Sequence, residues 1–481
     1  MNEAPRRLLW PDFIHEIAEL IRRSPAPPPV YIVGGATRDA CLGRAIGDID
    51  LAVDGDAIAL ARWVTDAWQG DIYIMDRERG VARVFLSRGD HNITVDFANL
   101  RGPTLEADLR DRDFTMNAMA ADLLGDPGRL IDPLDAAADL KMKILRRCSQ
   151  RSIAADPVRA LRAIRLSVQF DLKIEPDTAR DIRQFASELR QTSPERIRDE
   201  FFKLLSLENA ARGLRVLGHM GLLGQVLPGI ALDKVSRQAA AAHIDHFAVV
   251  ERMSAIITAI SRRRSDNTAA AFELGTLVIQ LDRFRAALGA HIEGKFGNGR
   301  SCAALLALAA LLHDAGLAGS DRGDGPAAAA QAVRSLKLTK NEGRILRAAV
   351  GNFRQIIAGQ AWSRLDAHRF WHGLGASGID AILLAMASAM GRGGQFNQQD
   401  WLQLVELATN LLDAYFNRFD EVVNPKLLLD GVAVQDLLEI GPGREVGRLL
   451  TSLREAQVTG LVQSLEQARE FVLRSSAGDG A

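Results

Sequence analysis

Two aspartates on either side of one apolar residue are the first feature of this sequence that could do chemistry. Asp48 and Asp50 flank Ile49 in a run expected to form a strand over residues 48–53. Because side chains alternate across a strand, both carboxylates fall on one face and Ile49 on the other. Neighbouring carboxylates repel one another unless a cation lies between them. Such an oxygen ligand set suits Mg²⁺, which also binds phosphates.

A glycine pair before these aspartates could hold an anion. Gly34 and Gly35 end an expected strand over Val30–Val33, and a short helix is expected to start near Ala36. Backbone N–H groups approach an anion closely at glycines, and a helix N-terminus adds about half a positive charge. Arg38 lies in the first turn of that helix and could reach the same anion. The pattern favours a phosphate-binding site beside the carboxylates.

A third carboxylate could come from Asp96, on an expected strand over Asn92–Phe97. If this strand neighbours the Asp48–Asp50 strand in register, the three acids would form a two-metal site. Alone, a glycine pair is usually a turn and an Asp-x-Asp pair is usually solvated. Their combination, with about ten residues between Arg38 and Asp48, is much more specific.

The stretch VYIVGGATRDACLGRAIGDIDLAV, residues 30–53, resembles the signature of class II tRNA nucleotidyltransferases, the family of CCA-adding enzymes and bacterial poly(A) polymerases. LRDRDFTMNA at 109–118 and ADPVRALRAIRLSVQF at 155–170 resemble two further elements of this family. The resemblance is firm over 27–230 and moderate over 424–472. It implies transfer of C and A residues from CTP and ATP to the 3′ end of tRNA, with Mg²⁺ as cofactor and pyrophosphate as product.

The resemblance also implies roles for the matching residues. It assigns catalysis and metal binding to Asp48 and Asp50 with Asp96 as candidate third ligand, the triphosphate to Gly34, Gly35 and Arg38, and nucleotide binding to Arg112, Asp156, Arg159, Arg162 and Arg165.

Asp156 and Arg159 have the chemistry to read a base without a template. Cytosine and adenine each present an amino donor beside a ring-nitrogen acceptor, which one fixed carboxylate and one fixed guanidinium can match. Guanine and uracil would leave buried groups unpaired, at about 1–3 kcal/mol each. Arg162 and Arg165 fan away along the expected helix, so contact with phosphate, support of the pocket and a structural ion pair all stay open for them.

Two departures from the family pattern concern base selection. Ala155 stands where the family often has Glu, and Asp111 replaces the first arginine of a doubled pair. If that Glu normally orients the selecting arginine, the choice of C and A over other bases is less secure. Neither departure touches the expected metal site.

A second, weaker constellation lies in the later half of the chain. His246, His313 and Asp314 resemble part of the metal-binding pattern of HD-type phosphohydrolases, and such ligands would suit a transition metal. The final acid of that pattern is missing, because Ser388 stands where it is expected and Asp380 is the one acid nearby. We therefore expect a vestigial HD site rather than an active hydrolase.

Composition and patterning set the expected architecture. The 481 residues, 47% hydrophobic and 25% charged, are typical of a globular protein of about three domains. Net charge is −1, but Lys141–Lys203 carries 15 basic and 9 acidic residues, which suits a polyanion. Three cysteines without metal-like spacing, a longest apolar run of 11 residues and no signal-peptide pattern favour a cytoplasmic enzyme without a membrane span.

The expected fold class is multidomain α/β plus α. A small mixed sheet is expected in a polymerase-beta-like nucleotidyltransferase head, and the β signal ends near Pro133, before an all-helical neck, body and tail. The expected segments are an N-terminal helix region 1–26, the head 27–133, a nucleotide-selecting and RNA-binding neck 134–230, a degenerate HD-like body 231–420, a tail 421–475 and a disordered end 476–481.

Several functions stay open from sequence alone. Full CCA addition to tRNA is the leading hypothesis, and addition of only CC or only A is an alternative. A poly(A) polymerase is less favoured, because the tail EFVLRSSAGDGA lacks a basic extension. A phosphohydrolase is disfavoured by the missing acid. No obligate protein partner is indicated.

Overall fold

The computed structural model describes residues 7–88, 91–232, 245–261, 272–318, 324–358, 362–391 and 397–477. The chain divides into two compact units. The first comprises Met1–Glu200 with Val216–Gln225, and the second comprises Phe201–Arg215 with Val226–Ala481. The division therefore falls inside the expected neck, 134–230, and the head shares a unit with the first part of that neck.

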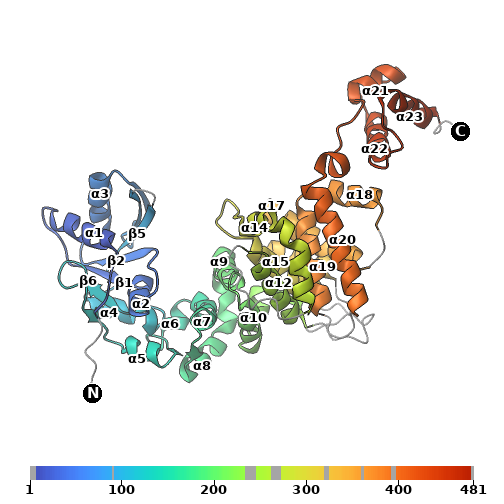
Figure 1. Ribbon diagram of the computed structural model, residues 1–481. Helices are drawn as coiled ribbons and strands as arrows, with labels where there is room; N and C mark the ends of the chain where they lie inside the picture. Colours follow the sequence, from blue (N-terminus) through green and yellow to red (C-terminus); the bar gives the residue numbers. More distant parts are fainter. Residues whose placement is uncertain are drawn as a thin grey trace. The chain divides into compact units, whose positions relative to one another are not determined.

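A seven-stranded mixed sheet forms the centre of the first unit (Figure 1). Its order is β3-β4-β5-β2-β1-β6-β7, with β2 and β5 parallel and the other neighbours antiparallel. The strands are β1 (Val30–Val33), β2 (Ile49–Val53), β3 (Asp71–Asp76), β4 (Val81–Arg88), β5 (His91–Asn99), β6 (Ala120–Asp122) and β7 (Leu130–Ile131).

Two amphipathic helices close one face of this sheet. In α1 (Asp12–Arg22) and α3 (Ala57–Trp68), apolar residues recur at helical spacing and pack with the buried strand residues into one core. The strand residues of this core alternate with polar ones, so the opposite face carries Asp50 and its neighbours. The predicted N-terminal helix and the strands predicted over residues 30–33, 48–53 and 92–97 are confirmed. Strands β6 and β7 were not predicted, because such short runs show no alternation.

Short elements lead from the sheet into a helical region. The Asp56 side chain caps α3 at its start, and Thr104 caps α4 in the same way. The elements are α2 (Gly35–Cys41), α4 (Leu105–Arg110), η1 (Thr115–Asn117), α5 (Ala136–Lys141), β8 (Ile144–Leu145), α6 (Ser152–Ala155), α7 (Val158–Gln169), β9 (Lys173–Ile174), α8 (Pro176–Gln184), η2 (Ala186–Gln191), α9 (Pro194–Leu205), α10 (Ala210–His219) and α11 (Leu223–Val226).

Helices dominate the second unit, and α15 and α19 are apolar almost all round because they lie in its core. The prediction of helices alone after Pro133 is wrong in detail, since β8 pairs with β9 and β10 with β11. The elements are β10 (Ile230–Ala231), α12 (His246–Ile260), α13 (Phe272–Leu281), η5 (Asp282–Phe284), α14 (Arg285–Glu293), α15 (Cys302–Leu312), β11 (Gly316–Leu317), α16 (Gly325–Ser335), α17 (Lys340–Ile357), α18 (Arg364–Leu374), α19 (Ser377–Gly391), α20 (Gln398–Phe416) and η7 (Phe419–Val423).

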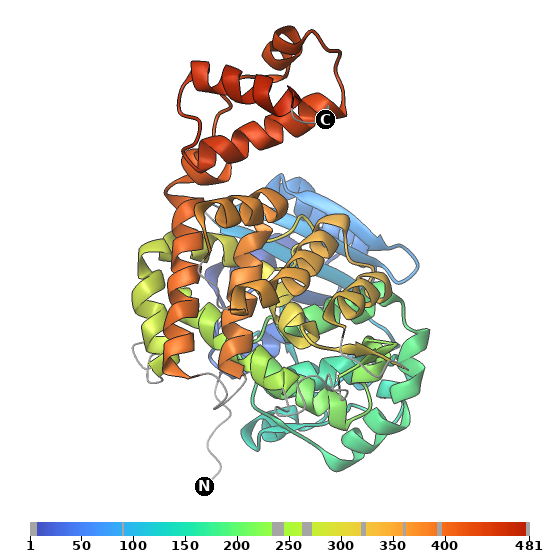
Figure 2. The ribbon, with the colours of Figure 1, turned by 90° about the vertical axis from the view of Figure 1, so that its right-hand side faces the viewer.

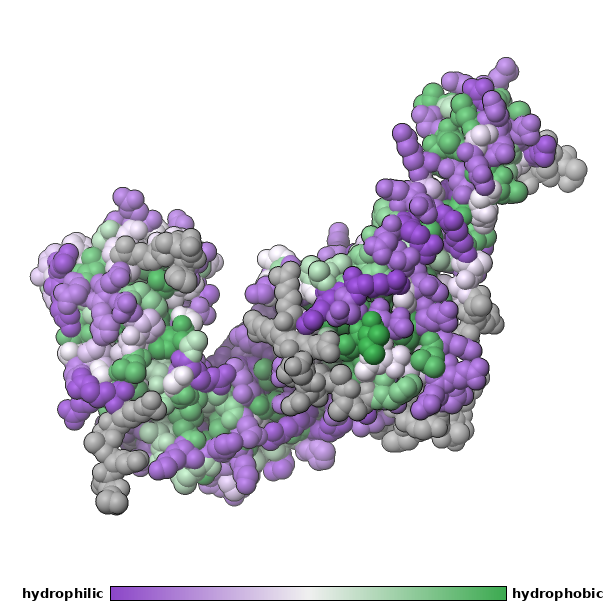
Figure 3. Space-filling model, in the orientation of Figure 1, coloured by the Kyte–Doolittle hydropathy of each residue, from purple (hydrophilic) through white to green (hydrophobic). Residues whose placement is uncertain are grey.

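The last three helices have a core of their own (Figure 2). They are α21 (Gly431–Leu438), α22 (Arg444–Val458) and α23 (Leu465–Ala477). The prediction of disorder from residue 476 is corrected at its start, because α23 continues through Ala477; residues 478–481 lie outside the described residues. Hydrophilic side chains cover most of the face that Figure 3 shows, with smaller hydrophobic areas between them.

None of the helices in the described ranges is, on its own, long and apolar enough to cross a membrane. The helices α18 and α19 are long and apolar enough only when they are taken together, and the chain bends by 112° between them. Most of α19 is buried inside the protein.

Candidate functional site

The carboxylates predicted to act together are brought together by the sheet. Asp50 lies on β2, directly opposite Asp96 on the parallel strand β5. Asp48 precedes β2, and Ile49 is fully buried on the other face. The predicted register of Asp96 and the predicted face of Asp50 are therefore confirmed. This row of acids is the candidate catalytic site.

Arg83, which the sequence analysis did not single out, binds Asp96 with both ends of its guanidinium. Its Nε and Nη2 atoms lie 2.7 Å from Asp96 Oδ1 and Oδ2. Arg83 comes from β4, where it is the cross-strand partner of Asp96. Within the described ranges, no three acidic, histidine or cysteine side chains are close enough to hold one ion. The geometry thus offers Asp48 and Asp50 as oxygen ligands, with Asp96 engaged by Arg83.

The electrostatics at Asp50 favour a cation. Burial raises the pKa of Asp50 above its usual value, and the Asp96 carboxylate raises it further. Arg112 and Arg83 act in the opposite direction without cancelling the shift. A buried acid beside other acids fits a divalent cation that arrives with a phosphate substrate, since Mg²⁺ is commonly held by one or two carboxylates and by phosphate oxygens.

Gly34 has a steric reason to be glycine. Its φ of 74° lies in the left-handed region, and an added Cβ would come 2.8 Å from Asp50 Oδ2 and 3.4 Å from an Arg112 guanidinium nitrogen. The Arg112 side chain is mostly buried and is held by Asp108, with Nε 2.9 Å from Oδ2. Gly34, Asp50 and Arg112 therefore meet at one place, as the predicted phosphate and nucleotide roles require.

Arg38 is engaged by protein groups. Its Nε and Nη2 donate to the Asp39 carboxylate at 3.0 and 2.9 Å, and Nη1 donates to Asn117 Oδ1 at 2.7 Å. The guanidinium carbon also lies 4.4 Å from the centre of the Phe170 ring. The group predicted to bind triphosphate thus ties α2 to η1 and to the end of α7. Sequence spacing could not reveal the contacts with Asn117 and Phe170, because these residues lie 79 and 132 residues after Arg38.

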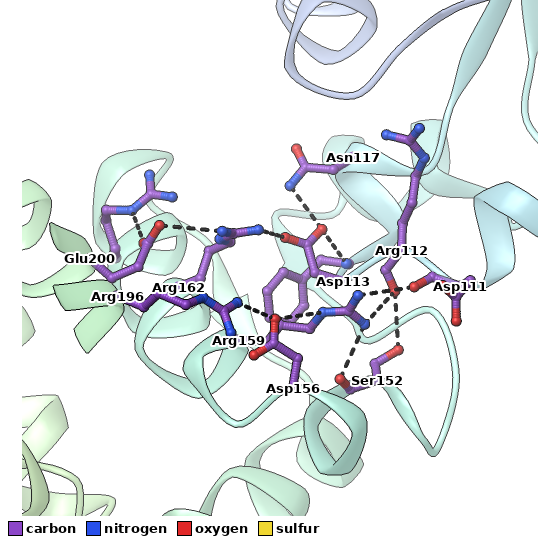
Figure 4. Close-up of polar contacts among 12 residues, drawn as sticks. Asp111, Arg112, Asp113, Asn117, Ser152, Asp156, Arg159, Arg162, Arg196 and Glu200 are labelled. Carbon is purple, nitrogen blue, oxygen red and sulfur yellow. Dashed lines mark hydrogen bonds and ion pairs between the residues drawn. The ribbon is translucent and has the colours of Figure 1, made fainter. Parts of the chain in front are cut away.

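Arg159 is held rigidly by backbone oxygens (Figure 4). Its Nη1 donates to the carbonyls of Arg112 at 3.3 Å and Ser152 at 3.2 Å, and its Nη2 donates to that of Asp111 at 3.1 Å. A guanidinium has five N–H donors, so some remain for a ligand. Main-chain carbonyls thus orient Arg159 although Ala155 replaces the expected glutamate. The Asp111 departure has little effect here, because its backbone makes the contact.

Asp156 lies beside Arg159, as predicted, and has a partner that the sequence analysis missed. Arg159 Nε is 3.9 Å from Asp156 Oδ2, and Arg196 Nη2 from α9 is 2.6 Å from the same oxygen (Figure 4). Arg196 lies within the span 27–230 that resembles the family, but no spacing rule connects it to Asp156 forty residues earlier.

Arg162 and Arg165 form structural ion pairs, one of the roles left open for them. Arg162 binds Asp113 at 3.0 Å and Glu200 at 3.4 Å, while Arg165 binds Glu200 at 2.9 Å. Burial opposes the ionisation of Asp113, but Arg162, Asn117 and the Phe114 backbone N–H outweigh it and lower the pKa of Asp113. This network holds Arg162 and Arg165, on the same helix as Arg159, through Asp113 and Glu200.

The HD-like residues His246 and His313 lie close together, and other protein groups contact the acids Asp314 and Asp380. The rings of His246 and His313 lie 5.3 Å apart, edge to face, and His313 also packs against Phe353. Asp314 is ion-paired with Arg354. Asp380 contacts His291 at 3.1 Å. The described ranges hold no group of three side chains that could bind one metal ion, and the vestigial HD site stays a prediction.

Comparisons with known proteins agree with this geometry. The family description "Poly A polymerase head domain" matches residues 30–146, and "Probable RNA and SrmB- binding site of polymerase A" matches 171–233. A CC-adding tRNA nucleotidyltransferase from Geobacter sulfurreducens is 32% identical over 92% of this chain and 91% of its own length. An A-adding tRNA nucleotidyltransferase from Deinococcus radiodurans is 32% identical over 94% of this chain and 96% of its own length.

A solved structure, a CCA-adding enzyme in its apo form I, has the same fold with a TM-score of 0.62 and 22% identity, over 96% of this chain and 93% of that one. The two relatives at 32% identity match this chain over more than nine tenths of its length. The chain therefore belongs to the family of tRNA nucleotidyltransferases that carry a poly(A) polymerase head domain.

Proposed function

We propose that this protein adds C residues, A residues or both to the 3′ end of tRNA, using CTP and ATP and releasing pyrophosphate. The observation that carries the proposal is the meeting of Gly34, Asp50 and Arg112 beside the neighbouring strands β1 and β2. A nucleophilic hydroxyl, a triphosphate and a cation can all be held at that point. The family supports the substrate class, because its full-length relatives act on tRNA.

The residues of the head would position the reacting groups. Asp48 and Asp50 would hold Mg²⁺, which supplies charge neutralisation at the phosphates and a lower pKa for the attacking 3′-hydroxyl. The backbone around Gly34 and Gly35, together with Arg112, would hold the triphosphate in line with the RNA end. Catalysis by positioning suits phosphoryl transfer, where proteins contribute mainly geometry and electrostatics.

The residues of the neck would choose the base. Asp156 would accept from the exocyclic amino group of cytosine or adenine, and Arg159 would donate to the neighbouring ring nitrogen. Arg159 is held by three carbonyls and Asp156 by Arg196, so both groups are fixed before the nucleotide arrives. Fixed groups can discriminate because a wrong base leaves them unpaired.

Addition of only part of the CCA sequence is the second candidate. The CC-adding and the A-adding relatives are equally identical to this chain over nearly its whole length, so identity does not choose between them. Both candidates use the same catalytic residues.

One experiment tests both candidates. Purified protein with Mg²⁺ receives tRNA transcripts ending at the discriminator base, at C, at CC and at CCA, each with CTP, ATP or both. Completion of every shortened transcript to CCA, followed by arrest, identifies a full CCA-adding enzyme. Arrest at CC, or addition of A to the CC form alone, identifies a partial enzyme. Long A tails would identify a poly(A) polymerase, and no addition to any transcript would contradict the proposal.

A further inference from the structure

A row of side chains leads across the sheet from its edge to the candidate catalytic site. Tyr73 on β3 pairs with Arg83 on β4, Arg83 pairs with Asp96 on β5, and Asp96 pairs with Asp50 on β2. Cross-strand partners share a face of the sheet, so all four side chains lie on the face opposite α1 and α3. With strands about 4.8 Å apart, Tyr73 stands roughly 14 Å from Asp50.

Two aromatic side chains are exposed at the outer part of this face. Tyr73 is 64% exposed and Phe85 is 46% exposed. Phe85 follows Arg83 by two residues on β4 and therefore lies on the same face. Neighbouring exposed aromatic residues on one sheet face are a common feature of binding surfaces, whereas scattered single ones are not.

Arg83 neutralises the negative charge of Asp96, which lies between these rings and Asp50. Without it, Asp96 would present a negative charge in the path of any polyanion that approaches Asp50. The two-point contact with Asp96, 2.7 Å at each end, balances that charge within the protein. The face from Tyr73 to Asp50 therefore offers aromatic surface and a neutral ion pair up to the metal-binding acids.

We propose that Tyr73 and Phe85 form a stacking subsite for the unpaired bases that precede the 3′-terminal nucleotide of the RNA substrate. The inference rests on the proposed function, since the 3′-hydroxyl must reach the acids at Asp48 and Asp50. The nucleotides that precede the 3′-terminal one must then lie on a surface that adjoins Asp48 and Asp50. Base stacking tolerates any sequence, so the subsite suits an RNA end that changes with each addition.

The test compares wild-type protein with the double variant Tyr73→Ala/Phe85→Ala on whichever shortened tRNA the wild type extends. We expect the KM for tRNA to rise about 5- to 150-fold for each lost stack, with an unchanged KM for the nucleotide and an unchanged Tm. The single variant Tyr73→Phe keeps an aromatic ring at this position and should therefore retain most of the wild-type affinity for tRNA. A 2-aminopurine placed next to the terminal nucleotide should be quenched on binding to the wild type and not to the double variant.

Trp63 provides the matched control. It is 37% exposed on α3, which packs on the opposite face of the sheet, so Trp63→Ala should leave the KM for tRNA unchanged. The inference is overturned if the double variant keeps the wild-type KM for tRNA, or if it loses equal affinity for an RNA with a blunt, fully paired 3′ end. If the wild type extends no transcript, the proposed function fails instead, which is a distinct result.

Discussion

Asp50 of the head and Glu342 of the helical body are arranged in opposite ways. In the head, Asp50 lies next to Asp96 and near Asp48, and burial together with these neighbours raises its pKa. In the body, the buried Glu342 accepts from Arg300 at 2.7 and 2.8 Å, and this contact lowers its pKa. Glu342 is balanced by the guanidinium of Arg300, while Asp50 is left partly unbalanced.

This difference separates a catalytic site from structural ion pairs. An acid whose ionisation costs stability is retained where a ligand must supply the missing positive charge. An acid with its own guanidinium stabilises the fold and has no vacancy for a metal. The Asp314–Arg354 pair follows the second pattern, which is the physical reason to regard the HD-like cluster as vestigial.

The largest effect is expected from breaking the unbalanced site. Asp50→Asn keeps the shape but removes the charge that binds the cation, so nucleotide addition should be abolished while tRNA binding persists. Apo protein should become more stable, because a raised pKa means that ionisation of Asp50 opposes folding. The gain in Tm should be present above the raised pKa and disappear as the pH falls below the unfolded value of about 3.9.

Activity assays with Mg²⁺ and thermal melts of apo protein from pH 3 to 8 measure both effects. Asp54→Asn, at an exposed aspartate just after β2, is the control and should change neither quantity. Measurable turnover by Asp50→Asn would contradict the metal assignment.

The next effect concerns the pocket of Asp156 and Arg159. Arg159→Ala should reduce the preference for CTP and ATP over GTP and UTP by about 5- to 150-fold, because the donor that a wrong base leaves unpaired is gone. Affinity for the triphosphate should change much less. Competition assays with mixed nucleotides measure the preference. Arg180→Ala, at an exposed arginine on α8, is the control. Unchanged selectivity in Arg159→Ala would rule out the reading of bases by Arg159.

The smallest effect is expected in the body, on stability alone. The pKa of Glu342 is lowered to about 2 from its ordinary 4.5. Although burial opposes this shift, Arg300 and the Thr339 backbone and hydroxyl groups more than compensate. The pair should contribute about 3 kcal/mol above pH 4.5, a contribution that is lost as the pH falls toward 2.

Glu342→Gln should therefore lower the free energy of unfolding at pH 7 and remove part of its acid dependence, with kcat unchanged. Denaturant unfolding at several pH values measures this. Glu466→Gln, at an exposed glutamate on α23, is the control. A loss of nucleotide addition in folded Glu342→Gln would contradict the separation between head and body.

Local pattern was enough to predict much of the fold. The alternation of Asp48, Ile49 and Asp50 predicted a strand with one buried side, and the structure confirms it. An N-terminal helix was expected within residues 1–26, and α1 lies there with its apolar residues buried. Strands β6 and β7 were not predicted, because runs of two or three residues show no periodicity. They form strands only by pairing with their neighbours in the sheet.

The amino-acid sequence by itself determined the family, several helices and strands with clear periodicity, and the candidate acids of the site with some of its candidate arginines. Only the tertiary structure decided their partners. Arg83 engages Asp96, Arg196 engages Asp156 and Arg38 engages Asn117 because strand order and helix packing bring distant residues together. Hydrogen bonds and ion pairs depend on distances of about 3 Å, and sequence spacing sets such distances only within one turn or one strand.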